Sequence, residues 1–397
     1  MTARGRQTAV VLTALLLAAT TGCQAQDPPA RPRDPAPSSK AAAPSSGAPA
    51  PSSGGAGFTL VASGDVLPHS SIIRQANADA GGQGYDFRPM LAGVKPVVTD
   101  ADLAICHMET VYGADGDYTG YPTFKSPPQV AEALAATGYD ACSTASNHTL
   151  DDGAAGIHRT LDALDRAGVR HAGSARTAAE AAAPTLLQAG GARVGHLAYT
   201  YGTNGIPLPE GRPWAVNLID PDKIVADARA VRRAGADVVV VSMHWGSEWQ
   251  DEPDAQQLRL SRQLTESRTN GRPDIDLILG THAHVPQAYE KVNGTWVVYG
   301  MGDQVAGPMV NHSGAHDPRG NEGTIGRFTF VPANDRSGRW QVEKAEFVPQ
   351  WFDVGPGRVV NLGDARLQGT GATGVRDRIR QVVLSRGAAG DGLVMAK

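Results

Sequence analysis

Residues 277–284 read Leu-Ile-Leu-Gly-Thr-His-Ala-His, a short apolar run that ends in two histidines at alternate positions. A run of this length next to a glycine is typical of a buried strand. In an extended segment, side chains two positions apart point to the same side, so the rings of His282 and His284 are expected to lie together. Imidazoles grouped in this way are candidate metal ligands.

The same kind of apolar run recurs from Phe58 onward, with segments of helical period between the runs. Residues 154–167 show that period, because Ile157, Leu161 and Leu164 fall on one helical face. The alternation predicts an α/β domain with largely parallel strand pairing. The expected strands are Phe58–Ser63, Ala101–Cys106, Ala141–Ala145, Val194–Thr200, Val238–Met243, Leu277–Leu279 and Trp296–Tyr299. The expected helices are Pro128–Thr137, Ala154–Ala167, Pro221–Ala234 and Asp254–Thr269.

Side chains able to bind a metal follow five of these strands. Because the carboxyl ends of parallel strands meet at one edge of a sheet, these side chains are expected to gather there. Taken singly, an aspartate after a glycine is an ordinary turn residue and a histidine at a strand end an ordinary core residue. The ordered set favours a site. The candidate metal ligands are Asp65, Glu109, Asn147, His244, His282 and His284.

Carboxylate, amide and imidazole ligands without a thiolate suit Mn, Fe or Zn, and we expect one or two such divalent ions. Two ions about 3.5–4 Å apart clamp a phosphoryl-type group and acidify a bridging water. His148 directly follows Asn147 and is the candidate general acid for a leaving oxygen. Lys125, His69 and His107 are candidates for substrate contacts, or else ordinary loop and core residues.

Composition excludes several classes of protein. The 397 residues carry a formal net charge of −4 and lack the basic excess of a general nucleic-acid binder. With three cysteines in the chain, a cysteine-rich zinc module is excluded. Cys106 and Cys142 end neighbouring predicted strands, where they are either buried small hydrophobic residues or, in an oxidising compartment, a disulfide.

The N-terminus has the pattern of a targeting segment. Arg4 and Arg6 precede the apolar run Ala9–Ala19, which is too short to span a bilayer. The Gly-Cys pair that ends at Cys23 resembles the bacterial lipoprotein signal, in which the cysteine is lipidated. We therefore predict a lipoprotein-type signal peptide over residues 1–23, with secretion without an anchor as the alternative. Residues 24–57 are rich in Pro, Ser, Ala and Gly, which predicts a disordered tether.

Taken together, the motifs resemble those of the CapA family, the bacterial capsule synthesis proteins associated with poly-γ-glutamate. The matching segments are Gly64-Asp65, Met108–Thr110, Ser146–Gly153, His244–Glu248, Gly280–Gln287 and Tyr299–Gly302. The family looks like a branch of the calcineurin-like metallophosphoesterases. The resemblance therefore implies a four-layer αββα sandwich of metallophosphoesterase type, a two-metal site at the strand ends and attachment to the outer face of the cell membrane. We expect this domain to span residues 58–355, followed by a tail over 356–397 with one helix near Val375–Leu384.

The sequence departs from the family pattern at several positions. Ordinary metallophosphoesterases carry a histidine two residues after the first aspartate, where this chain has Leu67, so the first metal site has lost a ligand. Glu109 stands where those enzymes use aspartate, and Ser146 where capsule-type members repeat asparagine. Gly302-Asp303-Gln304 replaces the usual Gly-Asn-Phe, which predicts an unusual substrate rim.

The resemblance implies a membrane-tethered, metal-dependent protein, hydrolase-like or phosphoesterase-like, that acts in synthesis, export or processing of poly-γ-glutamate or a similar anionic polymer. A secreted phosphodiesterase or phosphatase is one alternative, and a non-catalytic scaffold of a polymer-synthesis complex is another. The expected partners are an anionic polymer or a phosphoryl-containing small molecule, membrane polymer-synthase subunits, and the membrane through the lipid on Cys23. No nucleic-acid partner is expected.

Overall fold

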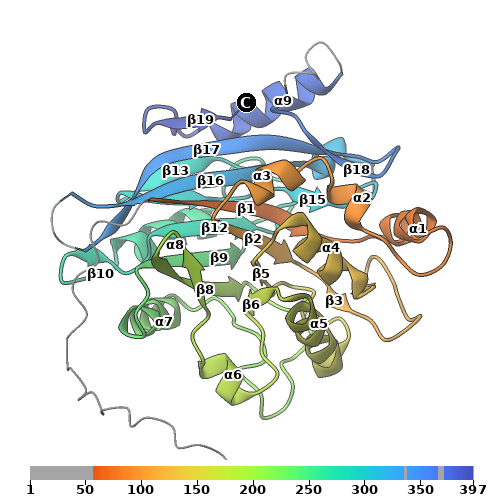
Figure 1. The fold of residues 1–397 in the computed structure, drawn as a ribbon, viewed down its shortest axis with the longest axis horizontal. Helices are drawn as coiled ribbons and strands as arrows, with labels where there is room; N and C mark the ends of the chain where they lie inside the picture. The colour runs from red at the N-terminus through yellow and green to blue at the C-terminus, as the bar shows by residue number, and fades with distance from the viewer. Residues whose placement is uncertain (1–56, 335–337, 365–370, 397) are drawn as a thin grey trace, which may run out of the picture. The chain divides into compact units, whose positions relative to one another are not determined.

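The computed structural model describes residues 57–334, 338–364 and 371–396, which fold around two large β-sheets (Figure 1). The predicted signal peptide, the lipidation site Cys23 and nearly all of the predicted tether lie outside the described residues. Within the part of the chain that is described, no helix combines the length and the apolar character needed to cross a membrane.

The larger sheet has nine strands in the order β18-β17-β16-β1-β2-β5-β6, with β15 also paired to β1 and β19 to β17. The strands β1, β2 and β5 pair in parallel, as the sequence predicts, and β6, which was not predicted, pairs with β5 in parallel as well. The long antiparallel strands β16 and β17 were not predicted, because polar residues such as Arg327 and Lys344 interrupt their apolar positions. The strands are β1 (Phe58–Val66), β2 (Leu103–Met108), β5 (Ala141–Ser143), β6 (Arg170–Ala172), β15 (Asp303–Val305), β16 (Glu322–Pro332), β17 (Trp340–Asp353), β18 (Arg358–Asn361) and β19 (Leu393–Met395).

The smaller sheet has six strands in the order β13-β14-β12-β9-β8-β7. Its four central strands are parallel and nearly continuous in apolar residues, as expected for strands covered on both faces. The strands are β7 (Leu186–Ala189), β8 (Ala192–Thr200), β9 (Val238–His244), β12 (Leu277–Thr281), β13 (Tyr289–Val292) and β14 (Thr295–Val298). The remaining described strands form two small sheets of two strands each. One pairs β3 (Val111–Tyr112) with β4 (Lys125–Ser126), and the other pairs β10 (Arg268–Thr269) with β11 (Arg272–Pro273).

Three apolar clusters define the layers. Leu60 of the larger sheet and Val240 of the smaller one belong to the cluster that fills the space between the sheets. Leu161 of a helix belongs to a cluster on the outer face of the larger sheet, and Leu264 of another to a cluster on the outer face of the smaller sheet. The layers therefore run helix, sheet, sheet, helix, which confirms the predicted αββα sandwich. The helices are α1 (Ser70–Asp79), α2 (Arg88–Leu91), α3 (Lys95–Thr99), α4 (Gln129–Thr137), α5 (Gly153–Ala167), α6 (Ala178–Ala182), α7 (Pro221–Arg233), α8 (Ala255–Glu266) and α9 (Ala372–Val383).

Strands β18 and β19 belong to the larger sheet, although the sequence analysis set residues 356–397 apart as a tail. β18 pairs with β17 antiparallel, and β19 pairs with β17 in parallel. The expected helix is α9, whose Ile379 and Val383 are fully buried in the cluster that lies between the sheets. The four-residue and three-residue strands were missed because they are too short to show a period.

Candidate metal centre

The carboxyl ends of parallel strands from both sheets meet at one edge of the sandwich. Asp65 lies near the end of β1, Glu109 directly follows β2, and His244 ends β9. His282 and His284 follow β12. All five side chains are buried, with relative exposures between 0% and 6%. The structure therefore brings the strand ends together as the sequence predicted.

Two groups of three residues bring possible ligand atoms within 4.8 Å of one another. We call them the Asp65 cluster, formed by Asp65, His107 and His244, and the Glu109 cluster, formed by Glu109, His282 and His284. The clusters adjoin, because His244 Nε2 lies 3.8 Å from Glu109 Oε1.

His107 reaches the Asp65 cluster from β2. Its Nε2 lies 3.6 Å from Asp65 Oδ1, and its ring stacks on that of His244 with centroids 4.7 Å apart. The sequence placed His107 among substrate contacts; the structure places it among the possible metal ligands. Leu67, at the position where related enzymes carry a histidine, is instead buried against Phe124 in a small apolar cluster. His107 thus supplies an imidazole to Asp65 from a different strand.

Asp303 is a further possible ligand that the sequence analysis assigned to a substrate rim. Its Oδ1 lies 2.9 Å from His284 Nδ1, and it forms a third group of potential ligands with Asp65 and His284. The reason is the pairing of β15 with β1, in which Asp303 is the register partner of Asp65. Asp303 is fully buried and so does not form part of an exposed rim.

The backbone at His282 and His284 is not extended, although the sequence analysis assumed an extended segment there. Both residues have positive φ, 93° and 57°, which is uncommon outside glycine. In this conformation the backbone N–H of His282 donates to Asp65 Oδ2 at 3.1 Å. The strained turn therefore fixes the carboxylate of Asp65 and brings both rings to Glu109.

Hydroxyl groups orient two of the imidazoles. His107 Nδ1 lies 2.7 Å from Ser143 Oγ, and His244 Nδ1 lies 3.0 Å from Thr281 Oγ1. These contacts fix each ring with its Nε2 toward the clusters, the role that outer partners commonly play for metal-binding histidines.

Asn147 and His148 occupy the loop after β5. Asn147 Oδ1 lies 2.9 Å from His244 Nε2, so its carbonyl reaches the Asp65 cluster. His148 Nδ1 lies 2.7 Å from Asp151 Oδ2, which also accepts from the backbone N–H of Phe124 at 2.6 Å. A carboxylate at Nδ1 fixes the orientation of the ring, as positioning of a general acid requires.

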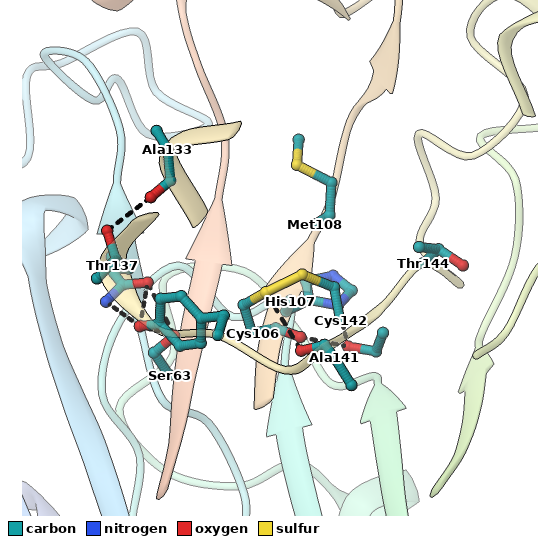
Figure 2. The surroundings of a disulfide bond; sticks show 12 residues. Ser63, Cys106, His107, Met108, Ala133, Thr137, Ala141, Cys142 and Thr144 are labelled. Atoms are coloured by element: carbon teal, nitrogen blue, oxygen red, sulfur yellow. Dashed lines mark hydrogen bonds between the residues drawn. A yellow bond between two sulfur atoms is a disulfide. The ribbon is translucent and has the colours of Figure 1, made fainter. Parts of the chain in front are cut away.

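Cys106 and Cys142 are register partners on β2 and β5, and they form a disulfide with a Cα–Cα distance of 4.4 Å. Of the two interpretations open from the sequence, the structure supports the disulfide. Figure 2 shows the bond between the strands, with His107 beside it. The bond therefore cross-links the strand that carries His107 to the strand that carries Ser143.

A match to a protein family identifies the chain. Residues 59–308 match the family model described as "Bacterial capsule synthesis protein PGA_cap". The chain belongs to this family.

Curated relatives of this PGA_cap-family chain cover part of it. A "Probable polyglutamine synthesis accessory protein" of Mycobacterium tuberculosis is 29% identical over 222 residues, 52% of this chain and 56% of the relative. The "Capsule biosynthesis protein CapA" of Bacillus anthracis is 25% identical over 181 residues, 45% of this chain and 42% of the relative. The chain thus spans about half the length of the curated relatives it matches.

Solved structures with a similar fold are more distant. The 5′-nucleotidase precursor of Thermus thermophilus aligns with a TM-score of 0.43 and 16% identity, covering 83% of this chain and 59% of that one. The NAD nucleotidase of Haemophilus influenzae aligns with a TM-score of 0.44 and 14% identity, covering 86% of this chain and 64% of that one.

The electrostatics of the PGA_cap site fit a bound cation. Burial, together with the neighbouring Asp303, raises the pKa of Asp65 to about 8. Burial also raises the pKa of Glu109 and of Asp303. Burial lowers the pKa of His107 to about 3, so this imidazole is neutral. Three carboxylates buried side by side are unfavourable unless a positive charge lies among them.

Unpartnered buried atoms agree with that conclusion. Both carboxylate oxygens of Glu109, Nε2 of His107, Nδ1 of His282 and Oδ2 of Asp303 lack a hydrogen-bond partner. Buried polar atoms are normally paired, so lone pairs grouped at one place are a donor set that fits a bound ion. The donor set is nitrogen and oxygen without thiolate, which fits Mn, Fe or Zn.

The other residues predicted to contact substrate lie outside the clusters. The ammonium of Lys125 pairs with Asp117, within the loop that leads to β4. His69 precedes α1, and its ring packs edge-on against Phe124 at 5.0 Å. Phe124 in turn packs against His148 at 4.8 Å. Tyr201, by contrast, lies beside the Glu109 cluster, because its ring centroid is 4.5 Å from that of His282.

Proposed function

We propose that this chain is a metal-dependent enzyme of the cell surface that acts in synthesis, export or processing of poly-γ-glutamate or a similar anionic capsule polymer. The names of its relatives in M. tuberculosis and B. anthracis supply the polymer context. The observation that carries the metal dependence is the pair of adjoining clusters whose buried ligand atoms have no other partner.

The proposed ligands are Asp65, His107, Asn147 and His244 on one side and Glu109, His282, His284 and Asp303 on the other. Bound divalent ions would supply Lewis acidity toward a phosphoryl or carboxylate oxygen and offset the charge of an anionic substrate. Asp65 and His284 belong to different clusters but share a third group with Asp303, so they link the two clusters. His148, oriented by Asp151, would donate a proton to the leaving oxygen.

The proposed location is the outer face of the cell membrane. The disulfide between Cys106 and Cys142 supports it, because disulfides persist in oxidising compartments. We propose that Cys23 carries the lipid anchor. Metabolic lipid labelling of the wild type should exceed that of Cys23→Ala, and equal labelling would remove the anchor from the proposal.

Metal content tests the centre directly. The full chain, loaded with Mn²⁺ and dialysed, should retain the metal by elemental analysis, while His282→Ala should lose most of it. His158→Ala changes a partly buried histidine of α5 and serves as the matched control, which should bind as the wild type does. Equal metal content in all three proteins would contradict the assignment.

Polymer production by cells tests whether the protein acts as a metal-dependent enzyme in polymer synthesis, export or processing. In a polymer-producing strain without its own copy of this gene, the wild type and His158→Ala should restore production and His282→Ala should not. Restoration by His282→Ala would favour a non-catalytic scaffold.

A second candidate function is hydrolysis of a small phosphodiester, which the contact between His148 and Asp151 favours. On this interpretation Mn²⁺-loaded protein turns over a chromogenic phosphodiester. His148→Ala should then lower turnover by about 10²-fold while leaving bound metal unchanged. Absence of turnover in the metal-loaded wild type would leave the polymer role as the better proposal.

A further inference from the structure

A second charged feature lies at the amino ends of β9 and β12, opposite the metal centre. A cavity of about 560 Å³ there is lined by arginines from α7, from the β10–β11 hairpin and from the residue before β17. Figure 1 shows β10 and α7 on the left of the view. We call this cavity the arginine groove. Its arginines are Arg229, Arg232, Arg233, Arg272 and Arg339.

The groove continues beyond these arginines. A neighbouring cavity of about 270 Å³ shares Pro273 and Arg339 with it and adds Arg268 and Lys291 to the lining. The basic lining therefore extends along the surface rather than surrounding one compact hole. Such a shape suits a chain with repeated negative charges better than a single small anion.

The guanidinium groups are held in place by the fold. The backbone carbonyl of Asp237 accepts from Arg232 Nη1 at 2.7 Å and also from Arg272. Arg229 Nε donates to Asp274 Oδ2 at 2.9 Å. The Nε atoms of Arg232 and Arg272 are buried and have no hydrogen-bond partner.

Carboxylates lie among some of these arginines, and Asp237 is close enough to Arg272 to act on its pKa. Asp274 and Asp276 pair with Arg229 and Arg232, respectively. Burial and the neighbouring Arg232 lower the pKa of Arg272, as expected where cations lie together. Arg233 and Arg268 are exposed, so their positive charges face the solvent.

The rest of the domain is acidic. The first 56 residues hold five basic and two acidic residues, so the remainder of the chain carries a net charge of −7. A polyanion is repelled by such a surface except where basic side chains are concentrated. The arginine groove provides that concentration.

We propose that the arginine groove binds an extended polycarboxylate chain. This inference rests on the proposed function, because the bound chain would be the polymer on which the protein is proposed to act. Planar guanidinium groups pair with carboxylates in a two-pronged geometry. Proteins that bind single-stranded nucleic acid add aromatic rings on which bases stack. In this groove Trp296 is covered by Lys291 at 5.6 Å, and Trp340 packs on Phe58 at 5.3 Å. The lining therefore favours carboxylates over bases.

Binding of fluorescently labelled poly-γ-glutamate to the full chain, measured by anisotropy at low salt, tests the proposal. The double variant Arg233→Glu/Arg268→Glu reverses two exposed charges of the groove. The matched control, Arg74→Glu/Arg166→Glu, makes the same charge change on α1 and α5. We expect the groove variant to weaken binding about tenfold or more and the control to change it less than about twofold.

Equal weakening of polymer binding in both double variants would contradict the assignment of the groove as the binding site, because it would show that binding responds to net charge alone. Tighter binding of a single-stranded oligonucleotide of equal charge would overturn the polycarboxylate assignment. His282→Ala separates this inference from the proposed function, because it should lose metal yet bind the polymer at the groove as the wild type does. Loss of polymer binding in His282→Ala would place the polymer at the metal centre and contradict the groove.

Discussion

The Nδ1 of His284 lies 2.9 Å from Oδ1 of Asp303, and both side chains are buried at the end of the β1–β15 pair. Burial alone would lower the pKa of His284. The carboxylate of Asp303 outweighs this effect, and the pKa of His284 lies above its ordinary value. Asp303 therefore acts on the site whether it binds an ion itself or orients His284 toward one.

Replacement of Asp303 tests this relationship. Asp303→Ala should weaken Mn²⁺ binding about 10–100-fold, because it removes a buried partner of a proposed ligand. Asp303→Asn keeps an oxygen at the same position and should weaken binding less. Calorimetric titration of the metal-free protein measures both, with Asp162→Asn on the exposed side of α5 as the control. Identical affinities for the alanine and asparagine variants would show that the oxygen of Asp303 has no part in binding.

Replacement of His107 tests whether this residue provides the imidazole that Leu67 does not. His107→Ala should remove an ion from the Asp65 cluster and leave the Glu109 cluster loaded, so the metal content per chain should fall without vanishing. The control is His196→Ala, another buried strand histidine, which bonds to Ser242 outside the clusters. If His107→Ala retains the full metal content, this residue is a structural histidine.

The disulfide should stabilise the fold. It closes a loop with a sequence separation of 36 residues, and a bond of this kind contributes roughly 2–4 kcal/mol to the free energy of unfolding. Cys106→Ala/Cys142→Ala should therefore unfold at lower urea concentration than the oxidised wild type. The difference should disappear when the wild type is reduced with dithiothreitol; if reduction has no effect on the wild type, the bond is absent in solution.

The buried His196 predicts a pH dependence. Burial lowers its pKa from 6.5 to about 4, so the unfolded chain binds the extra proton between these values and the folded protein does not. The contribution of neutral His196 to the free energy of unfolding should be fully present above pH 6.5 and be lost as the pH falls toward 4. This contribution is about 3 kcal/mol at most. Urea unfolding at pH 7 and pH 4.5 should give a smaller loss for His196→Gln than for the wild type. Equal losses would show that His196 does not cause the dependence.

The parallel strands and the helices between them were predictable because their apolar periods are local. The segment Val238–Met243, for example, is an unbroken apolar or small run that became β9. The same regularity located Asp65, His244 and His282, because each follows such a run. The carboxyl ends of parallel strands lie at the same edge of a sheet. Residues that follow such strands in the sequence could therefore be grouped into one site.

Asp303 could not be found in this way. It lies in a strand of three residues, and its position beside Asp65 depends on a pairing between segments more than two hundred residues apart. The positive φ of His282 likewise comes from the tertiary turn, since nothing in the Thr-His-Ala-His letters requires it. The disulfide was left open because a strand register, not the cysteine spacing, decides whether the two sulfurs meet.

Strand β9 sets the distance between the arginine groove and the metal centre. It begins beside Asp237, whose carbonyl anchors the arginine groove, and ends at His244 in the metal centre. Its seven residues correspond to about 23 Å at about 3.3 Å per residue. Under the proposed function, a polymer bound in the arginine groove must exceed that length before any part of it reaches the metal centre, so only long chains would be acted on while the groove holds them.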